Sequence, residues 1–266
     1  MRNRVLEKNE ELKAKGGKSF SIVLMIGDPD PKTTDRLVEV AVESGVDVVE
    51  LGIPYDNPFL DSPVMKASMH RALQWSNNMD DYLEYLEHIR KTFPDTAFEI
   101  MIYYDTVMQI GMQRFVDVLV KTEMDAVLVA DYIFQDPQFL HDFDKALEGS
   151  AVIPVRFVPH PYENDQLQDI KENARGFFIA QTPTNEEGER KGVQDSYKDK
   201  IDLLRQTGTQ TPIIAAYGIK TPEDIQKCLS FGADGVLLGT LALEKGYELP
   251  SEEFRELLVI LREAIA

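Results

Sequence analysis

Two carboxylates in the stretch VVELGIPYDNPFLDSP (residues 48–63) are placed to move protons. Glu50 interrupts a run of apolar residues typical of a buried strand, and Asp61 follows eleven residues later in a loop rich in Pro, Asn and Asp. A Glu50 side chain that faced apolar helices would be buried without a polar partner. We therefore expect it to face the interior of a barrel, near the end that is open to solvent. Partial desolvation there raises a carboxyl pKa towards neutrality, as a general acid or base requires. The alternative for each residue is an ordinary solvated or capping carboxylate.

A second set of residues is suited to holding an anion. Gly218 ends the apolar run PIIAAYG, and Gly239 and Thr240 end the run GVLLGT. A short helix is expected to start at Thr240, and backbone N–H groups at a helix start attract phosphate. The alternative is that both glycines only make tight turns between a strand and a helix. Lys220 is the basic residue near this site.

Eight short apolar runs, alternating with helical patterns, are the elements that must position these residues. The expected strands are residues 19–26, 47–53, 97–104, 126–131, 152–158, 176–181, 212–218 and 235–240. The expected helices are residues 33–43, 79–91, 112–121, 137–147, 164–173, 196–206, 222–231 and 252–266. Strands this apolar must be covered on both faces, which favours an α/β fold of the (β/α)8 or TIM-barrel type.

We therefore expect a single TIM-barrel domain over residues 1–266, with an extra N-terminal helix. Active sites of such barrels lie at the C-terminal ends of the strands, and phosphate is often held after strands seven and eight. Gly218 and Gly239 fall at those two places. The alternative fold is a doubly wound sheet, but the G-x-G-x-x-G turn of its dinucleotide-binding form is missing after the first strand.

Composition excludes several classes of function. The formal net charge of -18 argues against binding to nucleic acid or to an anionic membrane surface. The lone Cys228 suits a reducing cytoplasm, and neither a signal segment nor a membrane span is expected. The four histidines lack the spacing of metal ligands, so no metal site is expected.

Five segments carry a family resemblance: MIGDPDP, VELGIPYDNPFLDSP, IMIYYD, VLVAD and AYGIKTPED. In this order they resemble the tryptophan synthase α subunit over nearly the whole chain. The resemblance implies a lyase that cleaves indole-3-glycerol phosphate by a retro-aldol reaction to indole and glyceraldehyde 3-phosphate. It also implies transfer of indole to a β-type subunit that contains pyridoxal phosphate, and no cofactor of the chain's own.

The resemblance implies roles for single residues. Glu50 corresponds to the general acid/base at indole C3 and the glycerol hydroxyl, and Asp61 to the carboxylate that binds the indole N–H. Such a reaction needs one group to move protons and another to stabilise the developing cation. The residues implied to bind substrate are Tyr103, Asp131, Phe178, Gly218, Gly239 and Thr240. Phe178 stands in place of a family tyrosine, and Thr240 keeps the hydroxyl of a family serine.

The stretch GFFIAQTPTNEEGERKG, from residue 176, departs from the family pattern. Glu186 and Glu187 stand where a glycine loop would hold phosphate. Each carboxylate would cost about 1 kcal/mol or more within about 6 Å of a phosphate. Either the loop turns both carboxylates outward and Gly188 takes the place of the missing phosphate-binding glycine, or the substrate differs.

The main hypothesis is therefore a lyase that acts on indole-3-glycerol phosphate or a close analogue. One alternative is a catalytically weak α-like protein that binds and regulates a pyridoxal-phosphate-dependent β-type subunit, which the altered loop favours. Another is a lyase for a different indolic substrate.

Overall fold

The computed structural model describes residues 2–158, 175–181, 193 and 196–265. Strands and helices alternate along these residues, and paired strands run parallel. The strands are β1 (Ser19–Met25), β2 (Val48–Gly52), β3 (Ala97–Ile102), β4 (Ala126–Val129), β5 (Ile153–Pro154), β6 (Arg156–Val158), β7 (Phe178–Gln181), β8 (Ile213–Ala216) and β9 (Gly235–Leu238). Their order in the sheet is β5-β4-β3-β2-β1-β9-β8-β7-β6.

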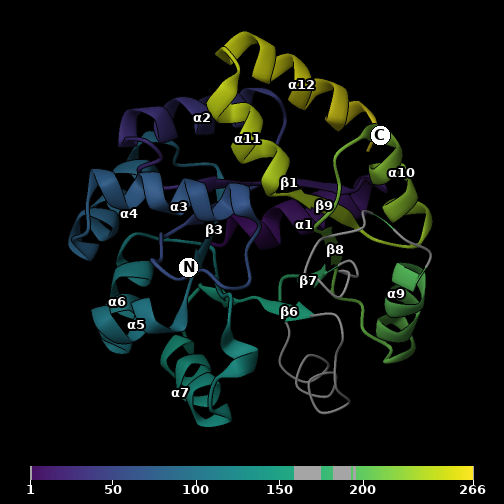
Figure 1. Cartoon of the computed structure of the whole chain (residues 1–266). Helices are drawn as coiled ribbons and strands as arrows, with labels where there is room; N and C mark the ends of the chain where they lie inside the picture. Colours follow the sequence, from purple (N-terminus) through teal and green to yellow (C-terminus); the bar gives the residue numbers. More distant parts are fainter. Residues whose placement is uncertain (1, 159–174, 182–192, 194–195, 266) are drawn as a thin grey trace.

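The two ends of this sheet meet in one chain segment. Only Val155 separates β5 from β6, and its amide donates to the carbonyl of Val127 on β4 at 2.8 Å. The sheet therefore closes into the barrel drawn in Figure 1, and the predicted TIM barrel is confirmed. The doubly wound alternative is wrong, because an open sheet would leave two edges apart. Each expected strand is present, with the fifth divided into β5 and β6.

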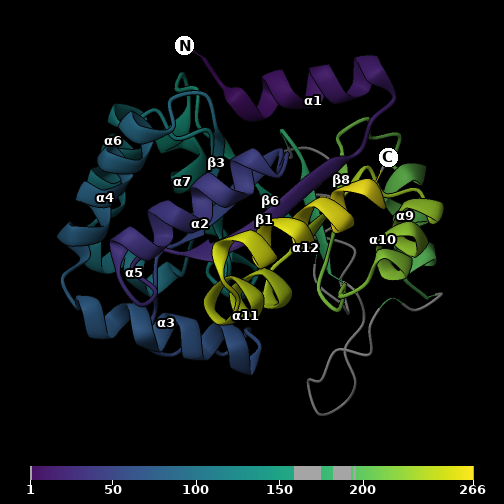
Figure 2. The ribbon, with the colours of Figure 1, turned by 90° about the horizontal axis from the view of Figure 1, so that it is seen from above.

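Helices surround the barrel, as Figures 1 and 2 show. Within the described residues the helices are α1 (Arg4–Lys15), α2 (Pro31–Glu43), α3 (Pro63–Trp75), α4 (Met79–Thr92), α5 (Tyr104–Ile110), α6 (Met112–Lys121), α7 (Pro137–Leu147), α9 (Ser196–Gln206), α10 (Pro222–Ser230), α11 (Thr240–Glu248) and α12 (Ser251–Glu263), with a 3-10 turn, η1 (Tyr132–Phe134). The predicted bounds of α6, α7 and α9 are confirmed. The helix expected over residues 164–173 lies outside the described residues.

Two helices, α3 and α5, are not predicted by the sequence pattern. The hydroxyl of Ser62 caps α3 by accepting from the amide of Met65 at 3.3 Å, and Pro63 occupies its first turn. The strand predicted over residues 97–104 is too long, because β3 ends at Ile102 and Tyr104 already begins α5. Both helices begin beside the predicted site and therefore help to position it.

The N-terminal helix α1 lies across the opposite end of the barrel from α3 and α11, as Figure 2 shows. The amide nitrogen of the Asn3 side chain donates to the carbonyls of Asp125 and Ala151, which precede β4 and β5. These bonds attach the start of α1 to the N-terminal ends of the strands. The predicted extra N-terminal helix is thus confirmed.

A fully buried carboxylate, Asp125, joins four elements at that end. Its Oδ1 accepts from the amide and the guanidinium of Arg4, at 2.8 and 3.2 Å. Its Oδ2 accepts from the guanidinium of Arg90 on α4 and from the amide of Phe98 on β3, at 2.7 and 3.0 Å. The exposed fractions of the Arg4 and Arg90 side chains are 6% and 8%, so both buried cations need a counter-charge. Asp125 supplies it for Arg90, and Asp125 and Glu123 supply it for Arg4.

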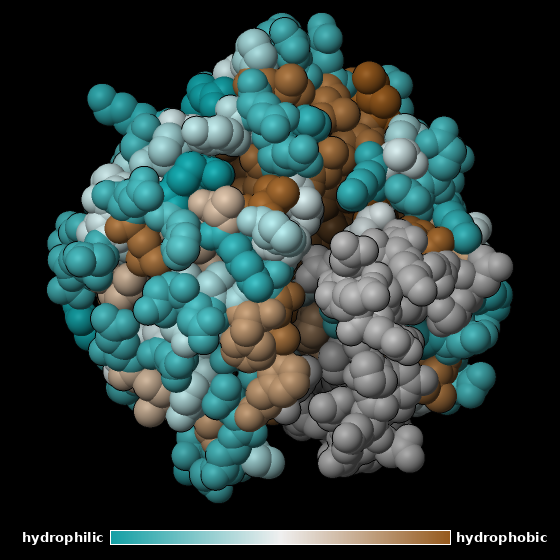
Figure 3. Space-filling model, in the orientation of Figure 1, coloured by the Kyte–Doolittle hydropathy of each residue, from teal (hydrophilic) through white to brown (hydrophobic). Residues whose placement is uncertain are grey.

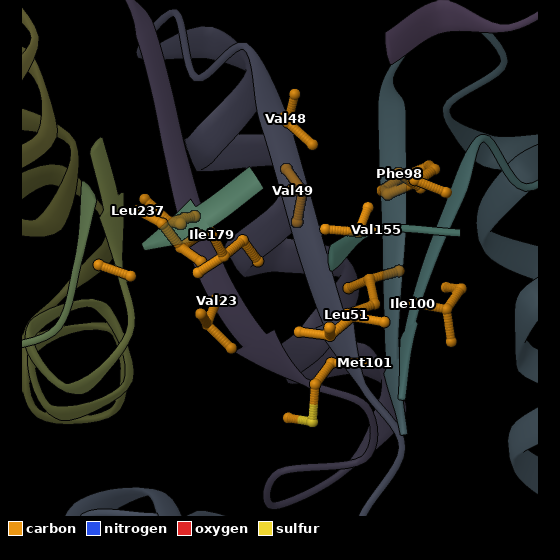
Figure 4. Close-up of a cluster of buried hydrophobic side chains, with 14 of the residues drawn as sticks. Val23, Val48, Val49, Leu51, Phe98, Ile100, Met101, Val155, Ile179 and Leu237 are labelled. Carbon is orange, nitrogen blue, oxygen red and sulfur yellow. The ribbon is translucent and has the colours of Figure 1, made fainter. Parts of the chain in front are cut away.

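Side chains of the strands alternate between the barrel interior and the helices outside. The Arg90 guanidinium of α4 lies 4.9 Å from the centroid of the Phe98 ring, so Phe98 faces the helices. Its neighbour Glu99 therefore faces the interior, together with its register partner Glu50 on β2. Figure 4 shows apolar side chains around this position, among them Val23, the register partner of Glu50 on β1.

The face of the molecule drawn in Figure 3 is largely hydrophilic outside the grey region. It shows hydrophilic residues over most helices, and hydrophobic residues that extend from the centre of the face towards its upper edge. None of the helices in the described residues combines the length and apolar character needed to cross a bilayer.

Candidate active site

Glu50 is a buried carboxyl group with an oxygen left free for a ligand. Its exposed fraction is 4%, and its Oε2 has no hydrogen-bond partner in the part of the chain that the structure describes. Burial, with a smaller contribution from the charge of Asp61, raises the pKa of Glu50 to about 8. A carboxyl group of this kind is mostly protonated at pH 7 and can act as a general acid.

Asp61 lies in the loop between β2 and α3, and Tyr103 at the end of β3 holds it. The Tyr103 hydroxyl donates to Oδ2 of Asp61 at 2.6 Å. Tyr103 is fully buried, and its ring stacks on Tyr55 with 4.8 Å between ring centroids. Burial raises the pKa of Tyr103 above its usual value, and the charge of Asp61 adds to the rise. The structure thus brings Glu50, Asp61 and Tyr103 together, as the sequence analysis requires.

Replacing Asp61 with asparagine is expected to lower the pKa of Glu50 by about one unit, because a neighbouring negative charge is removed. The measurement is a titration of glutamate side chains labelled with carbon-13 at the carboxyl group, followed by NMR. Asp56→Asn in the same loop is the matched control and should leave the pKa of Glu50 unchanged. A Glu50 pKa that stays the same or rises in Asp61→Asn would contradict this account of the site.

Asp131 follows β4, and its carboxylate supports the segment that carries Tyr103. Its Oδ1 accepts from the amide of Tyr104 at 2.8 Å, and its Oδ2 accepts from the side chain of Gln135 at 3.1 Å. Burial is the main reason why the pKa of Asp131 is raised. The carboxylate therefore satisfies the first amide of α5 and fixes the turn that follows Tyr103.

The predicted anion-binding residues lie at the C-terminal ends of the adjacent strands β8 and β9. Tyr217 and Gly218 have φ angles of 75° and 70°, so the chain turns sharply after β8. Thr240 is the first residue of α11, and its Oγ1 lies 3.0 Å from Oγ of Ser62, which caps α3. Two hydroxyl groups and two helix starts thus meet at one place, beside Gly239.

Phe178 lies on the side of β7 that faces the helices. It is the register partner of Arg156 on β6, and Arg156 forms an ion pair with Asp144 on α7. Register partners on parallel strands share a face of the sheet, so Phe178 is not brought together with Glu50. Its neighbour Ile179 occupies the interior side of β7 and is labelled in Figure 4.

Glu99 is a residue at the site that the sequence analysis missed. Its exposed fraction is 1%, and its backbone lies directly beside that of Glu50. The available signal was a second carboxylate inside an apolar run, AFEIMIYY, like that around Glu50. The altered stretch with Thr182, Glu186, Glu187 and Gly188 lies outside the described residues.

TIM-barrel enzymes that work by acid–base catalysis carry their ionisable groups towards the C-terminal ends of the strands, and Glu50 with Asp61 meets that description. The chain belongs to the tryptophan synthase alpha chain family, whose model matches residues 10–258. The family consists of lyases that cleave indole-3-glycerol phosphate.

Individual relatives match over almost their full length. The tryptophan synthase alpha chain of Thermoanaerobacter pseudethanolicus is 30% identical, over 99% of this chain and 100% of the relative. That of Synechococcus elongatus is also 30% identical, over 96% of this chain and 94% of the relative. Among solved structures, the tryptophan synthase subunit alpha of Legionella pneumophila superposes with a TM-score of 0.86 at 27% identity, covering 100% and 99% of the two chains.

Proposed function

We propose that this chain cleaves indole-3-glycerol phosphate to indole and glyceraldehyde 3-phosphate. The observation that carries the proposal is the buried Glu50 carboxyl, with a pKa of about 8 and a free oxygen, next to Asp61. A retro-aldol cleavage at an indole ring needs a proton donor that can take a proton back, and this pair is suited to that task.

In the proposed reaction Glu50 donates its proton to C3 of the indole ring. Asp61 accepts a hydrogen bond from the indole N–H and stabilises the positive charge that develops on the ring. The hydroxyl next to the ring then returns a proton to Glu50, and its oxygen forms a carbonyl. The carbon–carbon bond breaks, and its electron pair restores the aromatic ring. Glu50 ends in the protonation state in which it began.

The remaining site residues are proposed to bind and orient the substrate. Tyr103 holds Asp61 in place through its hydroxyl, and Asp131 supports Tyr103 through the first turn of α5. Gly218, Gly239 and Thr240 are proposed to bind the phosphate with backbone N–H groups, the Thr240 hydroxyl and the positive end of α11.

The resemblance implies that Phe178 binds substrate in place of a family tyrosine. The apolar contact from β7 comes instead from Ile179 in our proposal, because Phe178 faces the helices. This assignment concerns only the wall of the pocket and leaves the roles of Glu50 and Asp61 unchanged.

The test is to incubate the isolated protein with indole-3-glycerol phosphate and to measure indole and glyceraldehyde 3-phosphate separately. Equal molar amounts of both products are expected, because one bond is broken. A parallel reaction with indole-3-glycerol, which lacks the phosphate, should be much slower if the Gly218–Gly239 site binds that group. Absence of indole from both substrates, with and without an added β subunit, would reject the lyase proposal.

Regulation of a β-type subunit that carries pyridoxal phosphate is a second candidate function, and an exposed aromatic pair supports it. Phe59, in the loop after β2, is 51% exposed, and Phe134, after β4, is 59% exposed. Their ring centroids are 5.8 Å apart, and Phe59 also contacts Tyr103, which binds Asp61. A partner that covered this pair could therefore affect Asp61 through Tyr103.

Phe134→Ala is expected to weaken binding of a tryptophan synthase β subunit by about 10- to 100-fold, as loss of an aromatic anchor does at interfaces. Isothermal titration calorimetry gives the affinity directly. Ile260→Ala removes another exposed apolar side chain, on α12, and is the control expected to bind like the unaltered protein. Equal affinity of Phe134→Ala and Ile260→Ala would exclude the aromatic pair as the contact.

A further inference from the structure

Glu99 on β3 is a buried carboxyl group to which the reaction above gives no role. It is the register partner of Glu50, and both side chains point into the barrel interior. Oε2 of Glu50 and Oε1 of Glu99 are buried and lack hydrogen-bond partners in the described part of the chain. Each carboxyl group thus has one oxygen without a partner among the described residues, and a hydrogen bond joins the two side chains.

The surroundings of the pair favour a proton over any other neutralising group. The strands β1 and β4 flank the pair on either side. The register partner of Glu50 on β1 is Val23, and the register partner of Glu99 on β4 is Ala126. Neither residue can carry charge, and within the described ranges the other charged group that acts on Glu50 is Asp61, which is negative. Two adjacent carboxylates in an apolar interior cannot both ionise near neutral pH.

Burial and the adjacent Glu50 determine which member of the pair keeps its proton. Burial raises the pKa of Glu99 well above its usual value, and the charge of Glu50 raises it further. A hydrogen bond from Glu99 has the opposite effect on Glu50, whose pKa it lowers. Glu50 is therefore the first of the two to ionise, and Glu99 is the donor in the bond between them.

We propose that Glu99 is a positioning residue for Glu50. Glu99 remains protonated and donates its hydrogen to one oxygen of Glu50, while the other oxygen of Glu50 exchanges protons with the substrate. This inference rests on the lyase function proposed above and adds a residue to it. Glu99 itself does not contact the substrate in this arrangement.

The proton balance of the cleavage is unchanged by Glu99. The proton that reaches indole C3 comes from Glu50, and the proton of the substrate hydroxyl returns to Glu50. Glu99 keeps its own proton throughout. Its hydrogen bond strengthens when Glu50 becomes negative, because bonds to charged groups are stronger than bonds to neutral ones. Glu99 thus stabilises the intermediate state, in which Glu50 has given up its proton.

The test compares the pH dependence of kcat in Glu99→Leu and Glu99→Gln. In the unaltered protein kcat should fall as the pH rises through the pKa of Glu50. Glu99→Leu removes the donor, so this fall should move to higher pH by about one to two units. Glu99→Gln keeps an N–H donor and should leave the fall near its original pH. A fall at unchanged or lower pH in Glu99→Leu would overturn the proposal.

A measurement on the unaltered protein separates this inference from the lyase function and does not depend on folding of the variants. Carbon-13 NMR of labelled glutamate carboxyl groups should show Glu99 neutral over the pH range in which Glu50 titrates. Glu99→Gln and Glu50→Gln assign the two signals. Ionisation of Glu99 before Glu50 would overturn the proposal even if indole is released. A protein that releases no indole but shows this order would reject only the lyase function.

Discussion

Glu50→Gln is expected to lower kcat for indole release from indole-3-glycerol phosphate by about 10³-fold, which is within the usual contribution of a general acid or base. Glutamine has nearly the same size and can still form hydrogen bonds, but it cannot donate a proton to indole C3. The substrate should therefore still bind, with KM changed far less than kcat. The measurement is the initial rate of indole formation over a range of substrate concentrations.

Glu84→Gln makes the same chemical change at an exposed position on α4 and should retain the activity of the unaltered protein. The comparison separates loss of the acid from any general effect of changing a carboxylate. Retention of more than a tenth of kcat in Glu50→Gln would show that another group transfers the proton. Asp61 would then be the first residue to test, since it is the other carboxylate proposed to contact the indole ring.

Asp125→Asn is expected to lower the free energy of unfolding by about 3–5 kcal/mol, because it removes the ion-pair partner of the buried Arg90 guanidinium and leaves Arg4 with Glu123 alone. Asp125 is fully buried and accepts from Arg4, Arg90 and two backbone amides. Asparagine has a single acceptor oxygen, and its NH₂ group would face donors. The variant should also loosen α1, whose first turn depends on this carboxylate. Urea denaturation followed by circular dichroism measures the loss.

The matched control is Asp117→Asn on α6, where the carboxylate is exposed and accepts from Gln113 at 2.8 Å. That change should alter the free energy of unfolding by well under 1 kcal/mol. A loss of similarly small size in Asp125→Asn would mean that Arg4 and Arg90 find other partners. The active site lies at the far end of the barrel, so pH dependence of residual activity in Asp125→Asn should match that of the unaltered protein.

Most of the barrel could be predicted because hydrophobic patterning is local. The runs around β1, β2, β8 and β9 consist mostly of apolar residues, and the pattern between them has the helical period. The errors fall where a tertiary contact overrides that pattern. Tyr104 belongs to an apolar run, yet it starts α5, because Asp131 from the next strand accepts its amide.

The side of a strand on which a residue points was harder to predict. Phe177 and Phe178 are consecutive aromatic residues, so either one could face the interior by pattern alone. The pairing of Phe178 with Arg156, which binds Asp144 on α7, decides that Phe178 faces outward. Register between strands is a long-range property, and a shift of one residue would reverse every side chain.

The sequence by itself determined that the chain forms a barrel and that Glu50 and Asp61 are its acid–base candidates, since both follow from residue types and their spacing. Only the tertiary structure decided that Tyr103 holds Asp61 and that Glu99 lies against Glu50. The physical reason is that carboxyl groups 49 residues apart in the chain interact only after β2 and β3 pair in one particular register. Burial of that pair then sets which group carries a proton, and no local pattern contains that information.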